Sequence, residues 1–503
     1  MNKAVCNCFV CVTLFYFTAK GVKTMYDVAI IGCGVVGAAC AYTLSRYNLK
    51  TVVIEKNNDV CCKATRANSA IIHAGFDPEH GPLMAKLNVR GVPMAEEICK
   101  KLDVAYKNIG SLVVAFSDEE AKHVEKLLER GIKNGVPDLR IVDKDELRAM
   151  EPNIADTAVC ALYAPTAGIV NPWEYGIAMA ETAVKNGVQI MLETEVTDIS
   201  KKNGAYAITA GVAEIEAKYV INCAGVNSDD IHNMIAPEAF SIVPSAGEYY
   251  LLDKSEGTRA SHVIFQCPNK DGKGVLVSPT VHGNLIVGPN ADPRDKDDTS
   301  TKTACLDFVR EKAVKSIPSI SFRDNIRNFT GVRANSTVDD FIIDFADKNF
   351  LDLAGIKSPG LSAAPAIAEY AAELLKNAGL ELTEKTEFTD ERRHIRFKEL
   401  SAEEKNKVIK ERPEYGRVIC RCETITEGEI IDALRSPIPP VSLDGIKRRA
   451  GSGMGRCQGG FCGPKVLEIM AKHLNTAYEN ILQDNTGSYI LTEPTKNGGK
   501  ADV

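Results

Sequence analysis

The sequence predicts an α/β protein, α+β overall, in which a dinucleotide-binding domain carries an inserted, mostly antiparallel sheet and a small C-terminal domain. Three observations predict this fold class. Residues 26–55 contain a strand, a glycine-rich loop, a helix and a second strand in that order, as in a β-α-β unit. Short strands separated by Gly and Asn fill residues 240–290. Four cysteines gather between residues 420 and 462.

Composition is typical of an ordinary globular protein with several domains. The chain has 503 residues, of which 45% are hydrophobic and 25% charged, so a core can form without disulfides. The formal net charge of −7 argues against nucleic acid as a partner, because phosphate binding needs a basic face. We expect the basic run Lys447-Arg448-Arg449 to be a solvated face. In a chain this long, the 16 cysteines favour reduced thiols and a cytoplasmic location over disulfides.

Residues 1–24 are open to three interpretations. An apolar run extends from residue 4 to 19 after Lys3, which is too short for a confident membrane span. It is similar to the hydrophobic part of a signal peptide, but no clear small-residue cleavage site follows it. Translation could also begin at Met25. We favour that start, or a weak targeting segment, over a membrane anchor. We expect no membrane span in residues 25–503, so any membrane association would pass through a partner or an amphipathic surface.

The first β-α-β unit contains the expected nucleotide site. The motif Gly32-x-Gly34-x-x-Gly37 lies between an apolar strand at 26–33 and a helix at 35–47. The first glycine makes the turn, the second lets a pyrophosphate approach the backbone, and the third packs the helix on the strand. Glu55 ends the second strand, at 51–55. Its carboxylate can bind the adenosine ribose, which argues against NADP and leaves NAD or FAD in a Rossmann-type domain.

Further elements are expected along the rest of the chain. Residues 96–150 look helical and charged, and a helix is expected over 171–185. Another helix should have Ser358 as its N-cap and Pro359 as its first residue, and should stop at Gly379. The other expected strands are 111–116, 189–195, 219–223, 249–252, 275–278, 285–287, 341–344 and 350–353.

Residues 64–77 have the sequence ATRANSAIIHAGFD, which suits a segment that runs beneath a flat ring system. Other motifs follow the same family order between residues 26 and 378: GCGVVGAACAY, the AGIVNPWEY region, VINCAGVNS, GVRAN and GIKSPGLSAAPAIAEYAAELL. On these motifs the chain resembles the FAD-dependent oxidoreductases of the D-amino-acid oxidase-like superfamily. Within that superfamily it resembles anaerobic-type glycerol-3-phosphate dehydrogenases and L-2-hydroxyglutarate dehydrogenases.

The resemblance implies two catalytic residues. His73 would face the substrate hydroxyl and take its proton while hydride passes to the flavin. Arg333, in the motif that begins at Gly331, would point at the anionic group of the substrate or at the flavin. Ala334 replaces the proline that usually follows. A guanidinium fork serves phosphate and carboxylate alike, so this residue does not choose the substrate.

The resemblance also implies the residues that hold FAD. The helix that follows Ser358 would direct its positive end at flavin N1 and the C2 carbonyl, where negative charge gathers on reduction. Tyr249 and Tyr250 are neighbours on an expected strand, so one of them should face the pocket. His80 and His282 are expected at the surface or in loops. The expected FAD-binding residues are Gly32, Gly34, Gly37, Glu55, Lys56, Thr65, Asn68, Ser69, Val196, Ala224, Gly225, Gly331, Gly360 and Leu361.

The C-terminal cysteines form a C-x-C pair, Cys420 and Cys422, and a C-x4-C pair, Cys457 and Cys462, with 34 residues between the pairs. Four thiolates suit an iron–sulfur cluster or zinc. Residues 418–463 resemble the bacterioferritin-associated ferredoxin-like [2Fe-2S] domain, a small helical domain in which these four positions are the ligands. A structural zinc site and four unligated core thiols are the alternatives.

The two resemblances divide the chain. Residues 25–383 would form the FAD-dependent oxidoreductase domain, with FAD-binding parts at about 25–95, 155–225 and 330–380 and substrate parts at about 96–154 and 226–329. A linker over 384–412, the [2Fe-2S] domain over 413–475 and a C-terminal tail over 476–503 would follow. We expect residues 494–503 to be disordered.

The expected function is FAD-dependent oxidation of an anionic secondary alcohol, with sn-glycerol 3-phosphate to dihydroxyacetone phosphate as the first choice. Electrons would leave FAD through the [2Fe-2S] cluster to a separate acceptor, which is a protein or a quinone-linked system. The alternatives are an L-2-hydroxyglutarate dehydrogenase, an amine or amino-acid dehydrogenase, and a non-enzymatic electron-transfer protein. The last of these would not need the large substrate block at 226–330.

Overall fold

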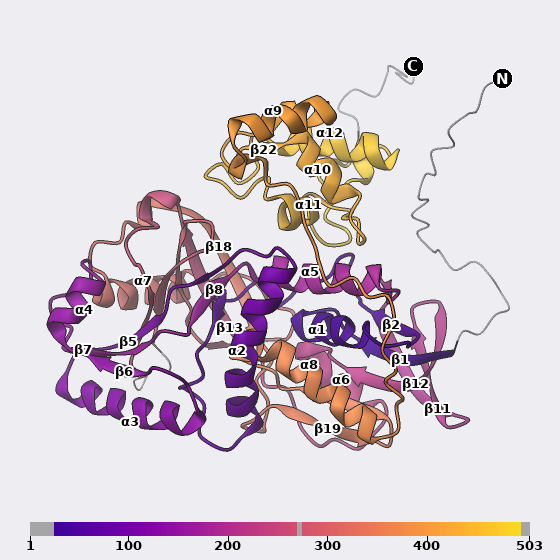
Figure 1. Cartoon of the computed structure of the whole chain (residues 1–503), viewed down its shortest axis with the longest axis horizontal. Coiled ribbons are helices and arrows are strands. Elements are labelled where there is room, and N and C mark those ends of the chain that lie inside the picture. The colour runs from indigo at the N-terminus through magenta and orange to yellow at the C-terminus, as the bar shows by residue number, and fades with distance from the viewer. Residues whose placement is uncertain (1–24, 269–273, 494–503) are drawn as a thin grey trace, which may run out of the picture.

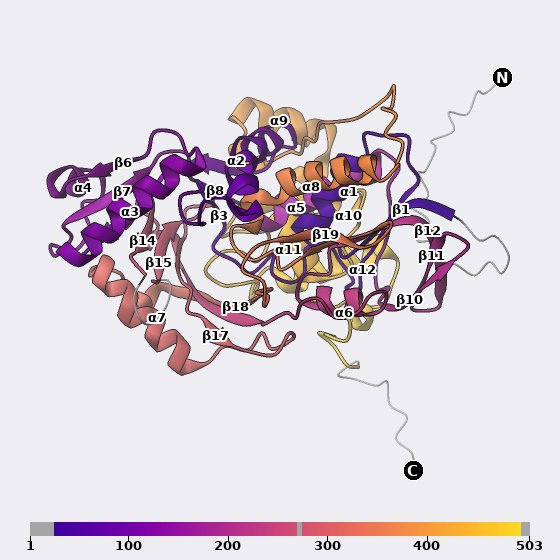
Figure 2. The same ribbon diagram turned by 90° about the horizontal axis from the view of Figure 1, so that it is seen from below.

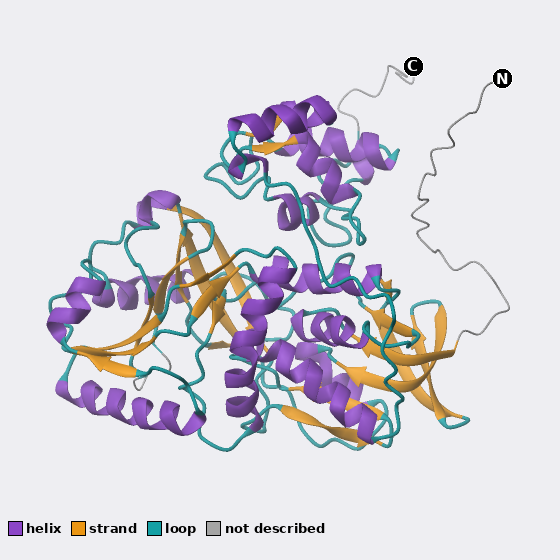
Figure 3. Ribbon diagram, in the orientation of Figure 1, coloured by secondary structure: helices purple, strands orange, loops and turns teal. Residues whose placement is uncertain are grey.

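The computed structural model describes residues 25–268 and 274–493. The interpretations of residues 1–24 and 494–503 concern parts of the chain outside these ranges. Figure 1 shows a large body, with a smaller domain above it that is formed by the C-terminal part of the chain. The body contains two main sheets that lie side by side, each flanked by helices (Figure 3). This mixed architecture confirms the predicted fold class.

The nucleotide-binding part is built on an eight-stranded sheet, formed by β1 (Met25–Ile31), β2 (Thr51–Ile54), β9 (Gln189–Met191), β10 (Val196–Lys202), β11 (Ala205–Ala210), β12 (Ala213–Asn222), β19 (Ile342–Asp347) and β20 (Phe350–Ala354). The order is β10-β11-β12-β1-β2-β9, and β20 pairs with both β12 and β19. β1 is parallel to β2 and β12, whereas β10, β11 and β12 form an antiparallel meander. The carboxyl ends of β1 and β2 therefore meet at one edge of the sheet, where the glycine motif begins.

A layer of helices covers this sheet. α1 (Val35–Leu44) packs on β1 and β2, α5 (Pro172–Lys185) and α8 (Gly360–Asn377) pack on α1, and α2 (Leu83–Lys101) packs on α8. α6 (Ser228–Asn233) contacts β12 and β20. α1 lies between α5 and α8 and is buried along most of its length, which its small residues permit. The expectation that Ser358 caps α8 is wrong. Pro359 occupies the N-cap position without a side-chain bond, and the Ser358 hydroxyl instead lies 3.4 Å from His73 Nε2.

The second sheet has nine strands, β5 (Ser111–Ala115), β6 (Arg140–Val142), β7 (Cys160–Ala164), β13 (Ser245–Leu252), β14 (Val263–Gln266), β15 (Leu276–Pro279), β16 (Leu285–Gly288), β17 (Asp292–Pro293) and β18 (Asn325–Arg333). Its described pairs are antiparallel except for β14 with β5. The helices beside it are α3 (Asp118–Asn134), α4 (Lys144–Met150) and α7 (Thr303–Ser316). In Figure 2 the strands β14 and β15 lie between α3 and α7. A long strand at β18 was not expected from the sequence.

A short three-stranded sheet connects the two parts of the body. It consists of β3 (Ile71–Ile72), β8 (Gly168–Val170) and β4 (Tyr106–Asn108), with β8 in the middle and both pairs antiparallel. Because β3 ends at Ile72, this sheet fixes the position of His73.

The C-terminal domain is mainly helical. It consists of α9 (Ala402–Glu411), β21 (Val418–Cys420), β22 (Ile425–Thr426), α10 (Glu427–Leu434), α11 (Leu443–Ala450) and α12 (Gly463–Leu474). Capping boxes begin α9 at Ser401 and α10 at Thr426, and apolar side chains of α10, α11 and α12 form its core. In residues 25–268 and 274–493, no helix combines the length and hydrophobicity that crossing a membrane requires.

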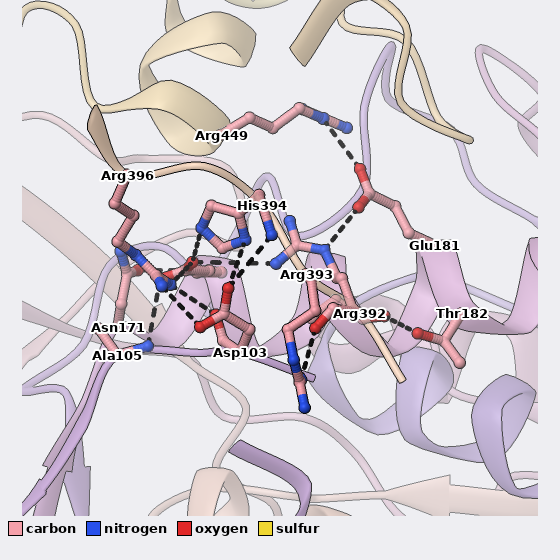
Figure 4. Close-up of polar contacts among 12 residues, drawn as sticks. Asp103, Ala105, Asn171, Glu181, Thr182, Arg392, Arg393, His394, Arg396 and Arg449 are labelled. Carbon is pink, nitrogen blue, oxygen red and sulfur yellow. Dashed lines mark hydrogen bonds and ion pairs between the residues drawn. The ribbon is translucent and has the colours of Figure 1, made fainter. Parts of the chain in front are cut away.

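The charged segment between the domains is pinned to the body (Figure 4). His394 Nδ1 lies 3.2 Å from Asp103 and its Nε2 3.4 Å from Glu174 on α5. Arg392 donates to Glu181, also on α5, at 3.0 Å. Burial opposes ionisation of Glu174, but its cationic neighbours outweigh burial and lower its pKa to about 2. The segment before α9 is therefore an ordered strap.

A buried ion pair joins the two domains directly. Asp59 accepts from Arg448 at 2.9 Å and from Arg449 at 2.8 Å, and all three side chains are at most 5% exposed. The two arginines come from α11, whereas Asp59 follows β2. Burial raises and the two guanidiniums lower the pKa of Asp59, with a net value of about 2. The prediction of a solvated basic run is thus wrong for Arg448 and Arg449, because each meets a carboxylate nearly 400 residues away along the chain.

Replacing Asp59 by Asn should lower the free energy of unfolding by about 3–5 kcal/mol, because two buried guanidiniums lose their carboxylate. Urea and thermal unfolding followed by circular dichroism measure the loss. The control Asp297→Asn removes an exposed pair with Lys63 and should change stability by less than about 1 kcal/mol. Equal losses in the two variants would contradict this role for Asp59.

Candidate active site and cluster site

One large cavity, of about 1620 Å³, is lined by residues of both main sheets and of the C-terminal domain. Pockets for small ligands usually measure about 300–1,000 Å³. The cavity therefore has room for a dinucleotide and a substrate together. The glycine loop opens onto it through Gly32 and Gly34.

The glycine loop has the geometry of a phosphate cradle. Gly32 has a φ of +95°, and a Cβ there would lie 2.6 Å from Cys223 O. A Cβ on Gly37 would lie 2.0 Å from Gly32 O, so only glycine lets α1 pack this closely on β1. A Cβ on Gly34 would meet only Thr65 Oγ1, at 3.4 Å, so the backbone there is open to a ligand. Gly34, Val35 and Val36 all line the cavity, so the N-terminus of α1 faces it, as a phosphate site requires.

The acid at the end of β2 is fixed beside this loop. Glu55 is 7% exposed and lines the cavity. One carboxylate oxygen accepts from Cys33 N at 2.8 Å, and the other from Asn57 N at 2.9 Å. The Thr65 hydroxyl accepts from Val35 N at 2.9 Å, which ties the segment 64–69 to the first turn of α1.

The structure brings nearly all of the expected FAD residues to the same cavity. Gly37 differs, because it lies beneath the loop as a packing residue. The expected FAD residues that line the cavity are Gly32, Gly34, Glu55, Lys56, Thr65, Asn68, Ser69, Val196, Ala224, Gly225, Gly331, Gly360 and Leu361. A Cβ on Gly331 would lie 1.9 Å from Ala67 O, so β18 passes directly against the segment 64–69. Their direct contact with FAD stays a prediction.

The backbone of His73 is fixed by hydrogen bonds to side chains of two helices. Its N–H donates to Ser362 Oγ on α8 at 2.7 Å, and its carbonyl accepts from Asn88 on α2 at 3.2 Å. The imidazole stacks on Phe265, with 5.7 Å between ring centroids, and lies near Ser358 at the start of α8. The ring is half-buried at the cavity wall, where it can reach a bound substrate.

Arg333 also lines the cavity, at the end of β18. Its guanidinium donates to Asn290 O at 3.0 Å and to Ser245 Oγ at 3.3 Å. Both acceptors are neutral, and in the described part of the chain no carboxylate forms an ion pair with it. Its positive charge is therefore available to an anionic ligand.

The pleat of β13 decides between the two neighbouring tyrosines. Tyr249 lines the cavity, stacks on Phe329 at 4.8 Å and lies 3.2 Å from Ser69 Oγ. Tyr250 points to the opposite face, where it packs edge-on against Phe322. The prediction that one of the pair faces the pocket is confirmed, and the structure identifies it as Tyr249.

Sequence reasoning gave His282 no role beyond a loop. It does lie in a turn, between β15 and β16, but it lines the cavity and its Nε2 is 3.2 Å from Asn171. Burial lowers its pKa. No motif surrounds it, so its position depends on strand pairing alone. His80, by contrast, is exposed and bonds to Asn134.

The four C-terminal cysteines gather as two pairs. Cys422 Sγ lies 3.8 Å from Cys457 Sγ, and Cys420 is hydrogen-bonded to Cys462. Each pair joins one cysteine of C-x-C to one of C-x4-C. Contact with Cys462, supported by backbone N–H groups of Gly453 and Glu423, outweighs burial and lowers the pKa of Cys420 to about 6, whereas the same contact raises the pKa of Cys462. Cys420 is thus the more acidic thiol of this pair.

This arrangement fits a centre with two irons. In the described ranges, no three His, Cys, Asp or Glu side chains surround one point closely enough to hold a single metal ion. Two separate thiol pairs instead suit a [2Fe-2S] cluster bound by four cysteines, with two ligands on each iron.

The fold and these two sites define a flavoprotein that carries an iron–sulfur domain. The chain belongs to the FAD-dependent oxidoreductase family, whose model, described as FAD dependent oxidoreductase, matches residues 27–374. The model of the BFD-like [2Fe-2S] binding domain matches residues 418–472. The protein is thus an FAD-dependent oxidoreductase whose cofactors are FAD and a [2Fe-2S] cluster.

Several proteins with known names are similar to this chain. A glycerol 3-phosphate dehydrogenase of Caloramator mitchellensis is 50% identical over 476 residues, covering 94% of this chain and 99% of its own. A glycerol 3-phosphate oxidase of Mycoplasma genitalium is 34% identical and covers 69% of this chain and 94% of its own. The structure of dithionite-reduced L-α-glycerophosphate oxidase from Mycoplasma pneumoniae with FAD bound superposes with a TM-score of 0.70 at 32% identity, over 74% of this chain and 99% of that one.

Gly37→Ala and Gly34→Ala should separate packing from cofactor binding. Gly37→Ala should destabilise the fold and lower FAD content, because its Cβ collides with the backbone. Gly34→Ala should leave the melting temperature of the FAD-free protein close to wild type but weaken FAD binding by about tenfold or more, since the added methyl occupies the phosphate approach. Calorimetry and the ratio of flavin to protein absorbance measure both. Full FAD occupancy in Gly34→Ala would contradict the cradle.

Proposed function

We propose that the protein is an FAD-dependent dehydrogenase that oxidises sn-glycerol 3-phosphate to dihydroxyacetone phosphate and passes electrons through its [2Fe-2S] cluster to a separate acceptor. The observation that carries this proposal is the similarity to the Caloramator dehydrogenase, which spans both domains at 50% identity. The cavity supports it, since His73 and Arg333 both line the space that contains the nucleotide loop.

The residues suit the oxidation of a secondary alcohol that bears a phosphate. Bound FAD supplies the hydride acceptor. His73 is placed to take the hydroxyl proton, so that loss of this proton and of the hydride from the same carbinol group leaves a ketone. Arg333 supplies an unneutralised guanidinium for the phosphate. The N-terminus of α8, which lacks a side-chain cap, directs its positive end at the cavity through Gly360.

The cluster loop supports an acceptor outside this chain. Gln458, inside the loop from Cys457 to Cys462, lines the cavity, whereas Phe461 in the same loop is 85% exposed. Cys422 is also exposed. The loop thus extends from the cavity wall to solvent. The match to the Mycoplasma pneumoniae oxidase covers 99% of that protein but only 74% of this chain. That oxidase is therefore too short to contain a counterpart of the whole C-terminal domain.

Anaerobic mixing with sn-glycerol 3-phosphate should bleach the flavin, and His73→Asn should slow the bleaching by about 10²–10⁴-fold, since Asn cannot take the hydroxyl proton. Stopped-flow absorbance in the flavin band measures the rate. The control His80→Asn changes an exposed histidine bonded to Asn134 and should bleach at the wild-type rate. Bleaching by L-2-hydroxyglutarate but not by sn-glycerol 3-phosphate would transfer the assignment to the carboxylate substrate.

Cys457→Ser should leave flavin bleaching by substrate intact and abolish onward transfer, because it removes a ligand of the cluster. Electron paramagnetic resonance of the reduced cluster and reduction of cytochrome c as a one-electron acceptor measure the transfer, and iron analysis reports cluster content. Cys305→Ser, at a half-buried thiol on α7, is the control and should behave as wild type. Undiminished cytochrome c reduction by Cys457→Ser would overturn the electron route.

A further inference from the structure

Two cationic side chains face the cavity where the domains meet. Lys447 belongs to α11 of the C-terminal domain, and Arg327 belongs to β18 of the second sheet. Both line the cavity, together with Gln458 of the cluster loop. Lys447 Nζ and Arg327 Nη1 each donate to Gln458 Oε1, both at 3.4 Å. Two positive groups from different domains therefore converge on one neutral oxygen.

The other basic residues of this junction are neutralised. Arg448 and Arg449 meet Asp59, Arg66 meets Asp484, Lys254 meets Glu423, and Arg456 meets Asp253. Within residues 25–268 and 274–493, neither Lys447 nor Arg327 has a carboxylate at ion-pair distance. Asp444 also lines the cavity, but its carboxylate is not at ion-pair distance from either cation and accepts from Gln483, so one carboxylate stands near two cations. This pair is thus a local excess of positive charge.

Lys447 is costly to keep in this position. Burial lowers its pKa to about 8, and the charges of Arg327 and Arg448 act in the same direction, against weaker effects of Asp444 and Asp484. Below that pH the amine is still protonated. A half-buried cation next to a guanidinium gains stability from a bound anion, because buried charges are stable only when they are paired.

We propose that Lys447, Arg327 and Gln458 form a phosphate-binding subsite of the cavity, built jointly by the FAD domain and the iron–sulfur domain. An ammonium and a guanidinium together match the two negative charges of a phosphate monoester or of a whole pyrophosphate, and the Gln458 amide can turn to donate a further hydrogen bond. The phosphate belongs either to the FAD pyrophosphate or to a free phosphorylated ligand. In both cases the subsite exists only while α11 is docked on the body.

This subsite is separate from Arg333. Arg327 precedes Arg333 by six residues on the same strand and pairs with Leu251, whereas Arg333 pairs with Ser245 at the other end of β13. About 3.3 Å per residue puts these two strand positions roughly 20 Å apart. A single small substrate cannot span them, so the inference does not depend on the proposed substrate.

The test uses the oxidised holoenzyme and two measurements. Isothermal titration calorimetry with inorganic phosphate gives its affinity, and dialysis followed by flavin absorbance gives FAD retention. Lys447→Gln and Arg327→Gln should each weaken one of the two by about tenfold, the loss of one charge-assisted contact. Weaker phosphate binding with FAD retained assigns a free phosphorylated ligand, and loss of FAD assigns the FAD pyrophosphate.

The controls separate this role from a structural one. Lys465→Gln changes an exposed lysine on α12 that does not line the cavity and should alter neither measurement. Lys447→Arg should retain binding. With sulfate as the probe, wild-type affinity should fall as pH rises through about 8, the pKa of Lys447, and should stay level in Lys447→Arg. Iron content and melting temperature confirm that each variant is folded. Because Arg327 belongs to the body and Lys447 to the C-terminal domain, Arg327→Gln tests the subsite without changing the iron–sulfur domain.

Phosphate affinity and FAD retention within twofold of wild type in both glutamine variants would overturn the subsite. This outcome is independent of catalysis, because no step of the test requires turnover.

Discussion

The structure depends on the buried contact between Asp59 and the two arginines of α11. Asp59 follows β2 by five residues, and Glu55 at the end of that strand faces the cavity. Arg448 and Arg449 adjoin Lys447, which also faces the cavity. One carboxylate therefore fixes the iron–sulfur domain directly against the segment that follows β2, beside the cavity. Because pairs of this kind are stable only when complete, the contact favours one docked arrangement over a range of loose ones.

The ordered strap before α9 provides a second set of contacts between the body and the C-terminal domain. Arg392 and Arg449 both approach Glu181 on α5, at 3.0 and 3.5 Å, so the linker and the C-terminal domain share one acceptor on the body. α5 in turn packs against α1, the helix that begins at the glycine loop. A continuous series of contacts thus runs from the C-terminal domain and the strap, through α5, to the glycine loop at the start of α1.

Sequence patterns predicted what is local. The β-α-β unit and the four C-terminal cysteines can be recognised from residue spacing alone, because the turn and the metal site each need particular residues at fixed separations. The start of α8 reaches the cavity, and its placement at the flavin stays a prediction; its cap was wrong, since the Ser358 hydroxyl lies near His73 instead. The basic run at 447–449 was misjudged, because nothing near it in sequence reveals Asp59. Lys447, Arg327 and His282 had no motif, since strand pairing and domain docking bring them to the cavity.

The pairing of the cysteines makes the stability of the C-terminal domain depend on iron. Each thiol pair joins one end of the domain to the other, so the cluster closes a loop of more than thirty residues. Closing a loop of this length with a cross-link stabilises a folded chain by roughly 3–4 kcal/mol, and metal binding is folding free energy in small domains. α11 lies inside that loop. Loss of iron should therefore make the segment that contains α11 less stable, and with it the part of the cavity wall that Lys447 and Arg448 provide, while the sheets of the body keep their own cores.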